Sequence, residues 1–288
     1  MGHCTKPRSS DRAVTIGAMI KVPPHTPKLS VGQRQVPQGT RALPGERLSK
    51  RVMHLKGCSR REAEQYIEGG WVLVDGQVVE EPMARVAQQT ITIDPQANLM
   101  ALDDVTLLLH KPSGFDAMAP LGVAGRHVKP AQQLLLPANH AADDPSGMRV
   151  LKRHFARLTA CVPLEMAASG LVVFTQDWRV LRKLSEDAAF IEHELRVDVL
   201  GNVSPEALQR LNATHADVPA VRVSVNSTTP DLTRLRVVFK GNHPGLVAWL
   251  CDQAALKIGG ITRLRIGRVA LGHLAQGQWR FLPVGEKF

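Results

Sequence analysis

The segment from Leu164 to Thr175 constrains the fold more than any other part of this sequence. A turn of small residues, Ala167-Ala168-Ser169-Gly170, leads directly into a short apolar run of leucine, valine and phenylalanine. Such a run after a turn signal predicts a β-strand. Glu165 precedes the turn and is the only acidic residue between Asp144 and Asp177. Any chemistry at this turn that needs a carboxylate must therefore use Glu165.

The charge of the chain favours a polyanionic partner, and nucleic acid is the first such partner to consider. The 288 residues carry a formal net charge of +10. Residues 1–50 hold nine lysines and arginines and two acidic residues, so nine minus two gives +7 of this charge. A solvated basic tail is the alternative explanation. The length is sufficient for two domains with cores of their own.

The four cysteines argue against a metal centre or a disulfide framework. Cys4, Cys58, Cys161 and Cys251 are far apart, and none forms a C-x-x-C pair. Reduced thiols are typical of a cytoplasmic protein. No apolar run has the length of a membrane-spanning helix, and the N-terminus lacks the apolar stretch of a secretory signal. We expect a cytoplasmic protein with no membrane partner.

The pattern of the chain predicts two folded domains after a tail. Residues 1–44 are rich in proline and basic residues and predict a disordered basic tail, with Met19 as an alternative start. A compact domain is expected over 45–94, a linker over 95–103 and a larger domain over 104–288. Helices and strands mix there without the regular alternation of βαβ units. This order predicts an α+β fold with a mostly antiparallel sheet.

The first domain is expected to be two helices followed by a hairpin and a closing strand. Leu48, Val52 and Leu55 follow one another at helical spacing. Ser59 can cap a second helix, because Glu62 stands three residues later as in a capping box. The apolar segments on either side of Asp75-Gly76 predict a two-residue β-hairpin, and a further strand is expected over 90–93.

The order of serine, paired arginines, glycines and Val74-Asp75-Gly76 resembles the small RNA-binding domain called S-four. Arg60 and Arg61 lie in the first turn of the second helix, where their charge opposes the helix dipole. A phosphate bound there would benefit from both the dipole and the cations. A solvated basic face is the alternative. The residues predicted to bind RNA are Arg47, Lys50, Arg51, Lys56, Ser59, Arg60 and Arg61, together with Lys111, Arg263 and Arg265 of the second domain.

Several segments of the second domain resemble the RNA pseudouridine synthases of the Rsu/Rlu type, which couple an S-four domain to a catalytic domain. They follow one another in the family's order. These segments are Leu107–Gly114, Gln133–Pro137, Ser169–Asp177, Ile261–Gly267, Leu271-Gly272 and Gly277–Arg280. The resemblance implies isomerisation of a flipped-out uridine without a metal or a cofactor.

Three positions depart from the family pattern. The family's Gly-Arg-Leu-Asp, whose aspartate is catalytic, corresponds to Val162–Glu165, so that Glu165 stands in the aspartate position. The tyrosine that stacks on the target base corresponds to Leu195. The basic residue that pairs with the aspartate falls in the uncharged segment Leu246–Leu250, and Arg263 or Arg265 could replace it. We expect Leu195 and Val247 to pack in the core, and His193-Glu194 to lie on the surface.

Two functions follow from this pattern. The first is a pseudouridine synthase that acts on ribosomal RNA with Glu165 in the role of the aspartate. The second is a catalytically silent protein that binds ribosomal RNA or assists its assembly. A DNA-binding or purely scaffolding role rests on charge alone. In the first two cases the expected partner is structured RNA, bound by a monomer that uses no metal and no small-molecule cofactor.

Overall fold

The computed structural model describes residues 45–99, 103–122, 128–215 and 218–288. The predicted tail over residues 1–44 lies outside the described part of the chain. Among the described residues, no helix combines the length and the apolar character needed to cross a membrane.

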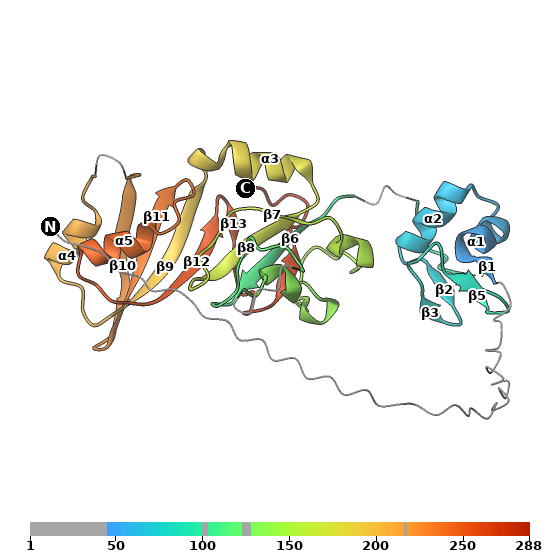
Figure 1. Ribbon diagram of the computed structural model, residues 1–288, viewed down its shortest axis with the longest axis horizontal. Coiled ribbons are helices and arrows are strands. Elements are labelled where there is room, and N and C mark those ends of the chain that lie inside the picture. Colours follow the sequence, from blue (N-terminus) through green and yellow to red (C-terminus); the bar gives the residue numbers. More distant parts are fainter. Residues whose placement is uncertain (1–44, 100–102, 123–127, 216–217) are drawn as a thin grey trace, which may run out of the picture. The chain divides into compact units, whose positions relative to one another are not determined.

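The first group of elements, before residue 100, has the predicted order of two helices, a hairpin and a closing strand (Figure 1). Leu48 and Val52 of the first helix pack against Ala63 and Ile67 of the second, and all four side chains are fully buried. The elements are β1 (Glu46–Arg47), α1 (Leu48–Lys56), α2 (Arg60–Glu68), β2 (Val72–Val74), β3 (Gln77–Val78), β4 (Arg85–Val86) and β5 (Ile91–Ile93).

The start of α2 confirms the predicted capping box. The backbone N–H of Glu62 donates to Ser59 Oγ at 3.3 Å, and the backbone N–H of Ser59 donates to Glu62 Oε2 at 2.7 Å. These two bonds satisfy backbone donors that a helix start leaves without partners. The chain turns at Asp75 and Gly76, which both have positive φ, as a two-residue hairpin requires.

One nine-stranded sheet organises the described residues from 103 onwards. Its main path runs β10-β11-β9-β12-β8-β6-β14, and every neighbouring pair is antiparallel except β12 and β8. The predicted α+β fold with a mostly antiparallel sheet is therefore confirmed. The strands are β6 (Thr106–Lys111), β7 (Thr159–Ala160), β8 (Ser169–Thr175), β9 (Glu192–Leu200), β10 (Val221–Thr228), β11 (Leu232–Lys240), β12 (Ile258–Ile266), β13 (Val269–Ala270) and β14 (Trp279–Phe281).

Helices cover different parts of this sheet. α4 and α5 bury Leu211, Leu246 and Leu250 against β9, β10 and β11, whereas α3 buries Leu184 with Val173 of β8 in another cluster (Figure 1). The helices are α3 (Trp178–Glu186), α4 (Pro205–Leu211) and α5 (Leu246–Gln253). Four short 3₁₀ helices accompany them: η1 (Ala131–Leu134), η2 (Pro137–Asn139), η3 (Lys152–Phe155) and η4 (Ala188–Phe190).

The parallel junction of β8 and β12 joins the two halves of the sheet. Gly170 pairs there with Arg263, and the hydroxyl groups of Ser169 and Thr262 are 2.9 Å apart. The register of β12 against β9 shifts between Arg263 and Arg265, which marks a bulge. Successive residues of a strand point to opposite faces, so a bulge redirects the side chains that follow it. This bulge in β12 thereby changes the direction of the Arg265 side chain relative to that of Arg263.

Candidate active site

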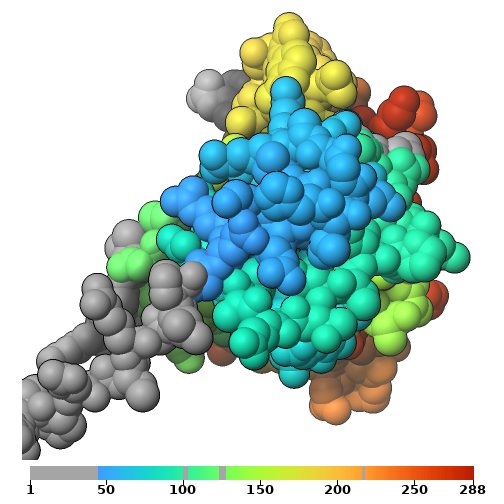
Figure 2. Space-filling model, turned by 90° about the vertical axis from the view of Figure 1, so that its right-hand side faces the viewer, coloured from blue at the N-terminus to red at the C-terminus, as the bar shows by residue number. Residues whose placement is uncertain are grey.

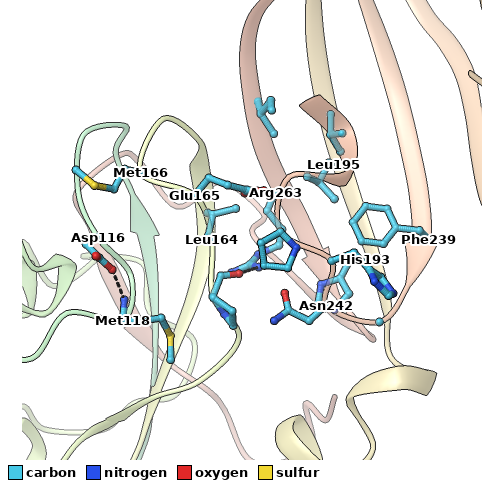
Figure 3. A pocket seen from close by; sticks show the side chains of 16 residues that line it. Asp116, Met118, Leu164, Glu165, Met166, His193, Leu195, Phe239, Asn242 and Arg263 are labelled. Carbon is cyan, nitrogen blue, oxygen red and sulfur yellow. Dashed lines mark hydrogen bonds between the residues drawn. The ribbon is translucent and has the colours of Figure 1, made fainter. Parts of the chain in front are cut away.

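A cavity of about 220 Å³ opens beside the parallel junction. It is lined by the loop after β6, the loop before β8, strands β9, β11 and β12, the loop between β11 and α5, and the start of α5. Figure 3 shows Glu165 and Met166 on one side of this cavity, and His193 and Phe239 on the other. The volume lies below the roughly 300–1,000 Å³ of sites for drug-sized ligands, so the cavity suits a single small group such as a nucleobase.

Glu165 is exposed at this cavity and is anchored at the start of α5. Its Oε1 accepts a hydrogen bond of 2.8 Å from the backbone N–H of Gly245, the residue that caps the helix. A helix N-terminus carries a partial positive charge that stabilises a carboxylate. Glu165 is therefore held in place by backbone from a segment that lies 80 residues later in the sequence.

Arg263 is the one lysine or arginine among the described residues that line the cavity, and its charge interacts with that of Glu165. Its side chain is buried, and its guanidinium donates to the carbonyl oxygens of Leu171, Pro163 and Val162 at 2.8, 2.8 and 3.1 Å. Burial lowers the pKa of Arg263 to about 9, so the group stays charged at neutral pH. Arg263 thus holds the loop that carries Glu165 and places a cation behind it.

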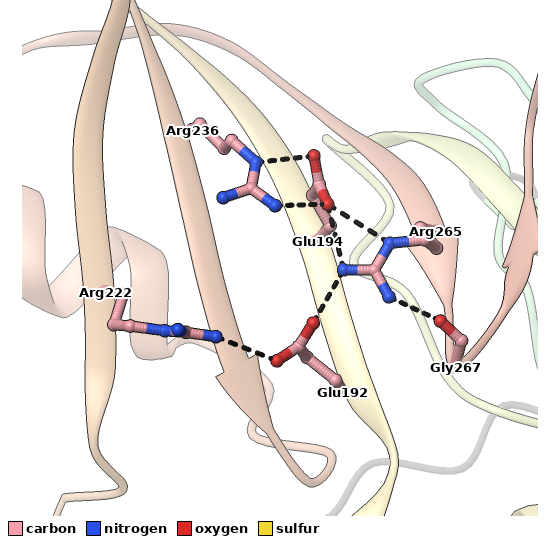
Figure 4. A network of polar contacts seen from close by, with 6 residues as sticks. All are labelled: Glu192, Glu194, Arg222, Arg236, Arg265 and Gly267. Carbon is pink, nitrogen blue, oxygen red and sulfur yellow. Dashed lines mark hydrogen bonds and ion pairs between the residues drawn. The ribbon is translucent and has the colours of Figure 1, made fainter.

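Arg265 lies outside the cavity. Its guanidinium pairs with Glu192 at 2.6 Å and with Glu194 at 2.9 Å, and Arg222 and Arg236 extend the same network (Figure 4). The carboxylates of Glu192 and Glu194 therefore neutralise the charge of Arg265. Of the two arginines that could replace the family's basic residue, the structure brings only Arg263 to Glu165.

Lys111 does not occupy the position expected of an RNA contact. The side chain is fully buried, and its Nζ donates to the carbonyl oxygens of Pro112, Phe115, Met166 and Ala168 at 2.6–3.4 Å. Burial, followed by the nearby charge of Arg263, lowers the pKa of Lys111 to about 8. Three ammonium protons meet four carbonyl oxygens, so none is free for a phosphate. Lys111 instead ties the loop after β6 to the loop before β8.

The sequence analysis missed a second carboxylate at the cavity. Asp116 lies in the loop after β6, and its Oδ1 accepts hydrogen bonds from the backbone N–H groups of Met118 and Ala119 at 2.8 and 3.1 Å (Figure 3). The family segment Leu107–Gly114 ends two residues before it. Its position two residues after that turn was the available signal.

The opposite wall of the cavity is apolar and aromatic. Leu195 and Val247 are both 5 % exposed and belong to the core, which confirms their predicted packing. The prediction that His193 lies on the surface is wrong, because its side chain is 3 % exposed. Burial, with the charges of Arg263 and other cations, lowers the pKa of His193 to about 3. His193 alternates with Leu195 and Val197 along β9, and this parity was the signal for burial.

The predicted RNA-binding residues of the first domain lie on or beside α1 and α2, the blue part of the surface in Figure 2. Arg60 pairs with Glu64 at 2.9 Å and Lys50 with Glu46 at 3.0 Å. Within the described residues, no ion pair engages Arg47, Arg51 or Arg61. The face therefore offers cations to a ligand, although Ser59 Oγ is already used as the cap.

Comparison with known proteins gives a family match for the first domain and similar proteins for most of the chain. Residues 46–89 match the S4 domain, so this is an S4-domain protein. An RNA pseudouridine synthase of Aquifex aeolicus is 23 % identical over 243 residues, which cover 83 % of this chain and 94 % of that protein. The synthase Rv1711 of Mycobacterium tuberculosis is 27 % identical over 259 residues, covering 87 % and 94 %. The dual-specificity synthase RluF of Escherichia coli is 24 % identical over 249 residues, covering 83 % and 76 %.

A crystal structure described as a pseudouridylate synthase aligns with 82 % of the chain and 95 % of its own length, at 16 % identity and a TM-score of 0.47. The chain thus combines an S4 domain with similarity, over most of its length, to RNA pseudouridine synthases, and this combination supports the expected Rsu/Rlu type.

Proposed function

We propose that this protein binds structured RNA, with ribosomal RNA as the partner, and isomerises a uridine in it to pseudouridine. One observation carries the proposal: Glu165 is anchored at a cavity of nucleobase size, with Arg263 behind its loop. The carboxylate of the family's aspartate is thus present as a glutamate, and a cation and a helix N-terminus accompany it.

The reaction needs a carboxylate beside the sugar of a uridine that has left its base stack. The bond between N1 and C1′ breaks and a bond between C5 and C1′ forms, while C5 loses its hydrogen and N1 gains one, so that the product is an isomer. Glu165 takes the place of the aspartate at C1′. Its extra methylene would displace the carboxylate, and an error of about 1 Å can cost on the order of a hundredfold in rate. The hydrogen bond from Gly245 restrains this longer side chain.

A catalytically silent RNA-binding protein is the second candidate, and two observations favour it. Pro163 stands where the family has arginine, and it offers the loop no side-chain charge. The start of α5 places Leu246 and Val247 in the apolar core, with no cation among the residues of the helix. Both candidates share RNA binding, so only the chemistry separates them.

Replacement of Glu165 tests the catalytic proposal. Glu165→Gln keeps an oxygen that can accept from Gly245 but removes the charge, and we expect it to lower the rate of pseudouridine formation by about a hundredfold or more. The matched control is Asp116→Asn, which keeps the acceptor for Met118 and Ala119 and should retain most of the activity. The substrates are unmodified transcripts of small- and large-subunit ribosomal RNA, read by carbodiimide primer extension.

Three results are distinguishable. Wild-type protein that modifies no uridine, while still binding the transcripts, would establish the silent alternative. Activity that survives Glu165→Gln but is lost in Asp116→Asn would transfer the chemistry to the second carboxylate. Loss of activity in Glu165→Gln alone, with unchanged RNA binding, supports the proposal.

The division of labour within the chain is part of this proposal. Residues 45–94 bind RNA, 95–103 form a linker, and 104–288 carry the chemistry in a monomeric protein of the cytoplasm. The three cysteines within the described residues are free thiols, in keeping with that compartment. The described residues also hold no group of three or more histidine, cysteine or acidic side chains that could share a metal ion.

A further inference from the structure

The cavity contains an aromatic surface at a position that the family pattern does not use. Phe239 of β11 lies against His193 of β9, with ring centroids 5.9 Å apart and planes 28° apart. The ring of His243, in the loop that follows β11, makes an edge-on contact with the ring of Phe239, with centroids 6.2 Å apart. All three rings line the cavity. Figure 3 shows His193 and Phe239 across the cavity from Glu165.

Phe239 provides the cavity with an aromatic ring that the family pattern would place at position 195. A base that leaves its stack loses contact with its neighbours and needs a flat partner. Leu195 stands at the position of the family's stacking tyrosine and has no π-face. Phe239 is the one phenylalanine, tyrosine or tryptophan among the described residues that line the cavity.

The sheet register places Phe239 close to Leu195, the residue at the position of the family's stacking tyrosine. Leu195 pairs with Val237 across β9 and β11, and His193 pairs with Phe239 two residues further along. Residues two apart in a strand share a face, so Phe239 projects to the same side of the sheet as Leu195. Both belong to one core cluster. The aromatic ring of this chain is therefore on β11 and not on β9, and it lines the same cavity as Leu195.

The surroundings of Phe239 make it a rigid surface. The side chain is 7 % exposed and is packed in the core, with His193 at its face. His193 is uncharged at neutral pH because burial lowers its pKa to about 3. A neutral, immobile pair of rings suits an uncharged nucleobase, and such contacts need little ordering when the base enters.

We propose that Phe239, supported by His193, is the residue on which the target uracil stacks, in place of the family's tyrosine. This inference rests on the proposed function, because it gives the same cavity its substrate contact. Stacking of one base on an aromatic side chain contributes about 1–3 kcal/mol, or roughly 5- to 150-fold. RNA affinity as a whole depends mainly on phosphate contacts elsewhere.

Exchange of the aromatic ring between the two strands tests this role. Phe239→Leu should lower the single-turnover rate of pseudouridine formation about tenfold or more, with little change in affinity for the ribosomal transcript. Phe239→Tyr should keep the activity. The double variant Phe239→Leu with Leu195→Tyr restores a ring at the family position and should regain most of the lost rate. Phe190→Leu, at an exposed phenylalanine that does not line the cavity, is the control.

The rescue separates a stacking role from a folding defect, because a protein that had merely lost its fold would not recover through Leu195→Tyr. Wild-type rates in Phe239→Leu, or loss of rate without rescue in a variant that keeps its melting temperature, would overturn the proposal.

A binding measurement distinguishes failure of stacking from failure of the proposed chemistry. Protein labelled with 4-fluorophenylalanine is titrated with uridine 5′-monophosphate, and the ¹⁹F signal of Phe239 is assigned by its disappearance in Phe239→Leu. We expect this signal to shift with the nucleotide and to stay in place with ribose 5-phosphate. A shift in a protein that forms no pseudouridine would refute the catalytic function and uphold the stacking surface. A signal unmoved by the nucleotide would refute the stacking surface.

Discussion

At the scale of single residues, the site depends on a close approach of two backbones. Gly170 has φ of +115° and lies against Arg263, the residue that holds the loop of Glu165. A Cβ atom at Gly170 would lie 2.3 Å from the carbonyl oxygen of Arg263 and 2.4 Å from its nitrogen. The glycine in the Ala-Ala-Ser-Gly turn is therefore required by the parallel junction of β8 and β12.

Gly170→Ala should lower the free energy of unfolding by about 3 kcal/mol or more. The new methyl group would overlap the backbone of Arg263, which is fixed by the pairing of β12 with β8 and β9. Gly147→Ala is the matched control. Gly147 also has positive φ, +65°, but nothing lies within 4 Å of the added atom, so we expect a loss of roughly 1 kcal/mol. Urea denaturation measures both values, and equal losses would show that the close approach has no special cost.

The residues of the site also show why part of it could not be predicted. Glu165 was recognisable because the turn and strand after it are contiguous in sequence. Its anchor at Gly245 and the choice of Arg263 over Arg265 depend on a bulge in β12 and on pairing between distant segments. No local pattern encodes those contacts. Phe239 was missed for the same reason, since only the register of β11 against β9 brings it to the cavity.

At the scale of elements, local signals predicted the two helices and the hairpin of the first domain and the strand that begins at Ser169. The capping box of α2 and the hairpin between β2 and β3 both depend on neighbouring residues, and both are confirmed. The loop-rich part between β6 and β8 had no such signal. It folds into short 3₁₀ helices around histidines and aromatic rings that come from distant strands.

His154 of η3 makes this part sensitive to acid. Its Nδ1 accepts a hydrogen bond of 3.3 Å from the backbone N–H of Leu151, and its ring packs on Phe281. Burial lowers the pKa of His154 from 6.5 to about 4. The unfolded chain therefore binds the proton first as the pH falls. The contribution of the neutral His154 side chain to the free energy of unfolding is complete above about pH 6.5 and is lost as the pH falls toward 4.

His154→Asn tests this dependence, because the asparagine oxygen can accept the same bond from Leu151 and does not titrate. Between about pH 7 and about pH 5, we expect the wild-type protein to lose about 2 kcal/mol more of its unfolding free energy than the variant loses. Urea unfolding at both pH values provides the measurement. Identical losses would mean that His154 is protonated in the folded state as readily as in the unfolded chain.

At the scale of the whole molecule, we expect two modules to share one RNA. The cavity can hold no more than a small group, so affinity must come from charges outside it. We expect the face of α1 and α2 to supply them, because Arg47, Arg51 and Arg61 form no ion pair within the described residues. The second domain, in contrast, binds several of its own arginines in ion pairs, as in the network of Arg265. The composition predicted a polyanionic partner, but only the structure separates the arginines held in ion pairs from those that form none.

Arg61, which forms no ion pair within the described residues, and Arg60, whose exposed pair with Glu64 is weak enough to exchange for a phosphate, should set the salt dependence of RNA binding. Each phosphate contact contributes about one unit to the slope of log Kd against log salt, so Arg60→Ala with Arg61→Ala should lower the slope by about two. The control is Arg182→Ala. Arg182 is exposed and pairs with Glu186 four residues later, as Arg60 pairs with Glu64, but it lies on α3 of the second domain. It should leave the slope unchanged.

Filter binding of a ribosomal transcript over a range of salt concentrations measures these slopes. Equal slopes for the double variant and the Arg182 control would mean that net charge, and not the start of α2, governs binding. A reduced slope in the double variant alone would assign the phosphates to the S4 domain. Because Glu165→Gln leaves this face intact, it should keep the wild-type slope even where it abolishes the reaction. The two modules would then be separable, one by its salt dependence and the other by its chemistry.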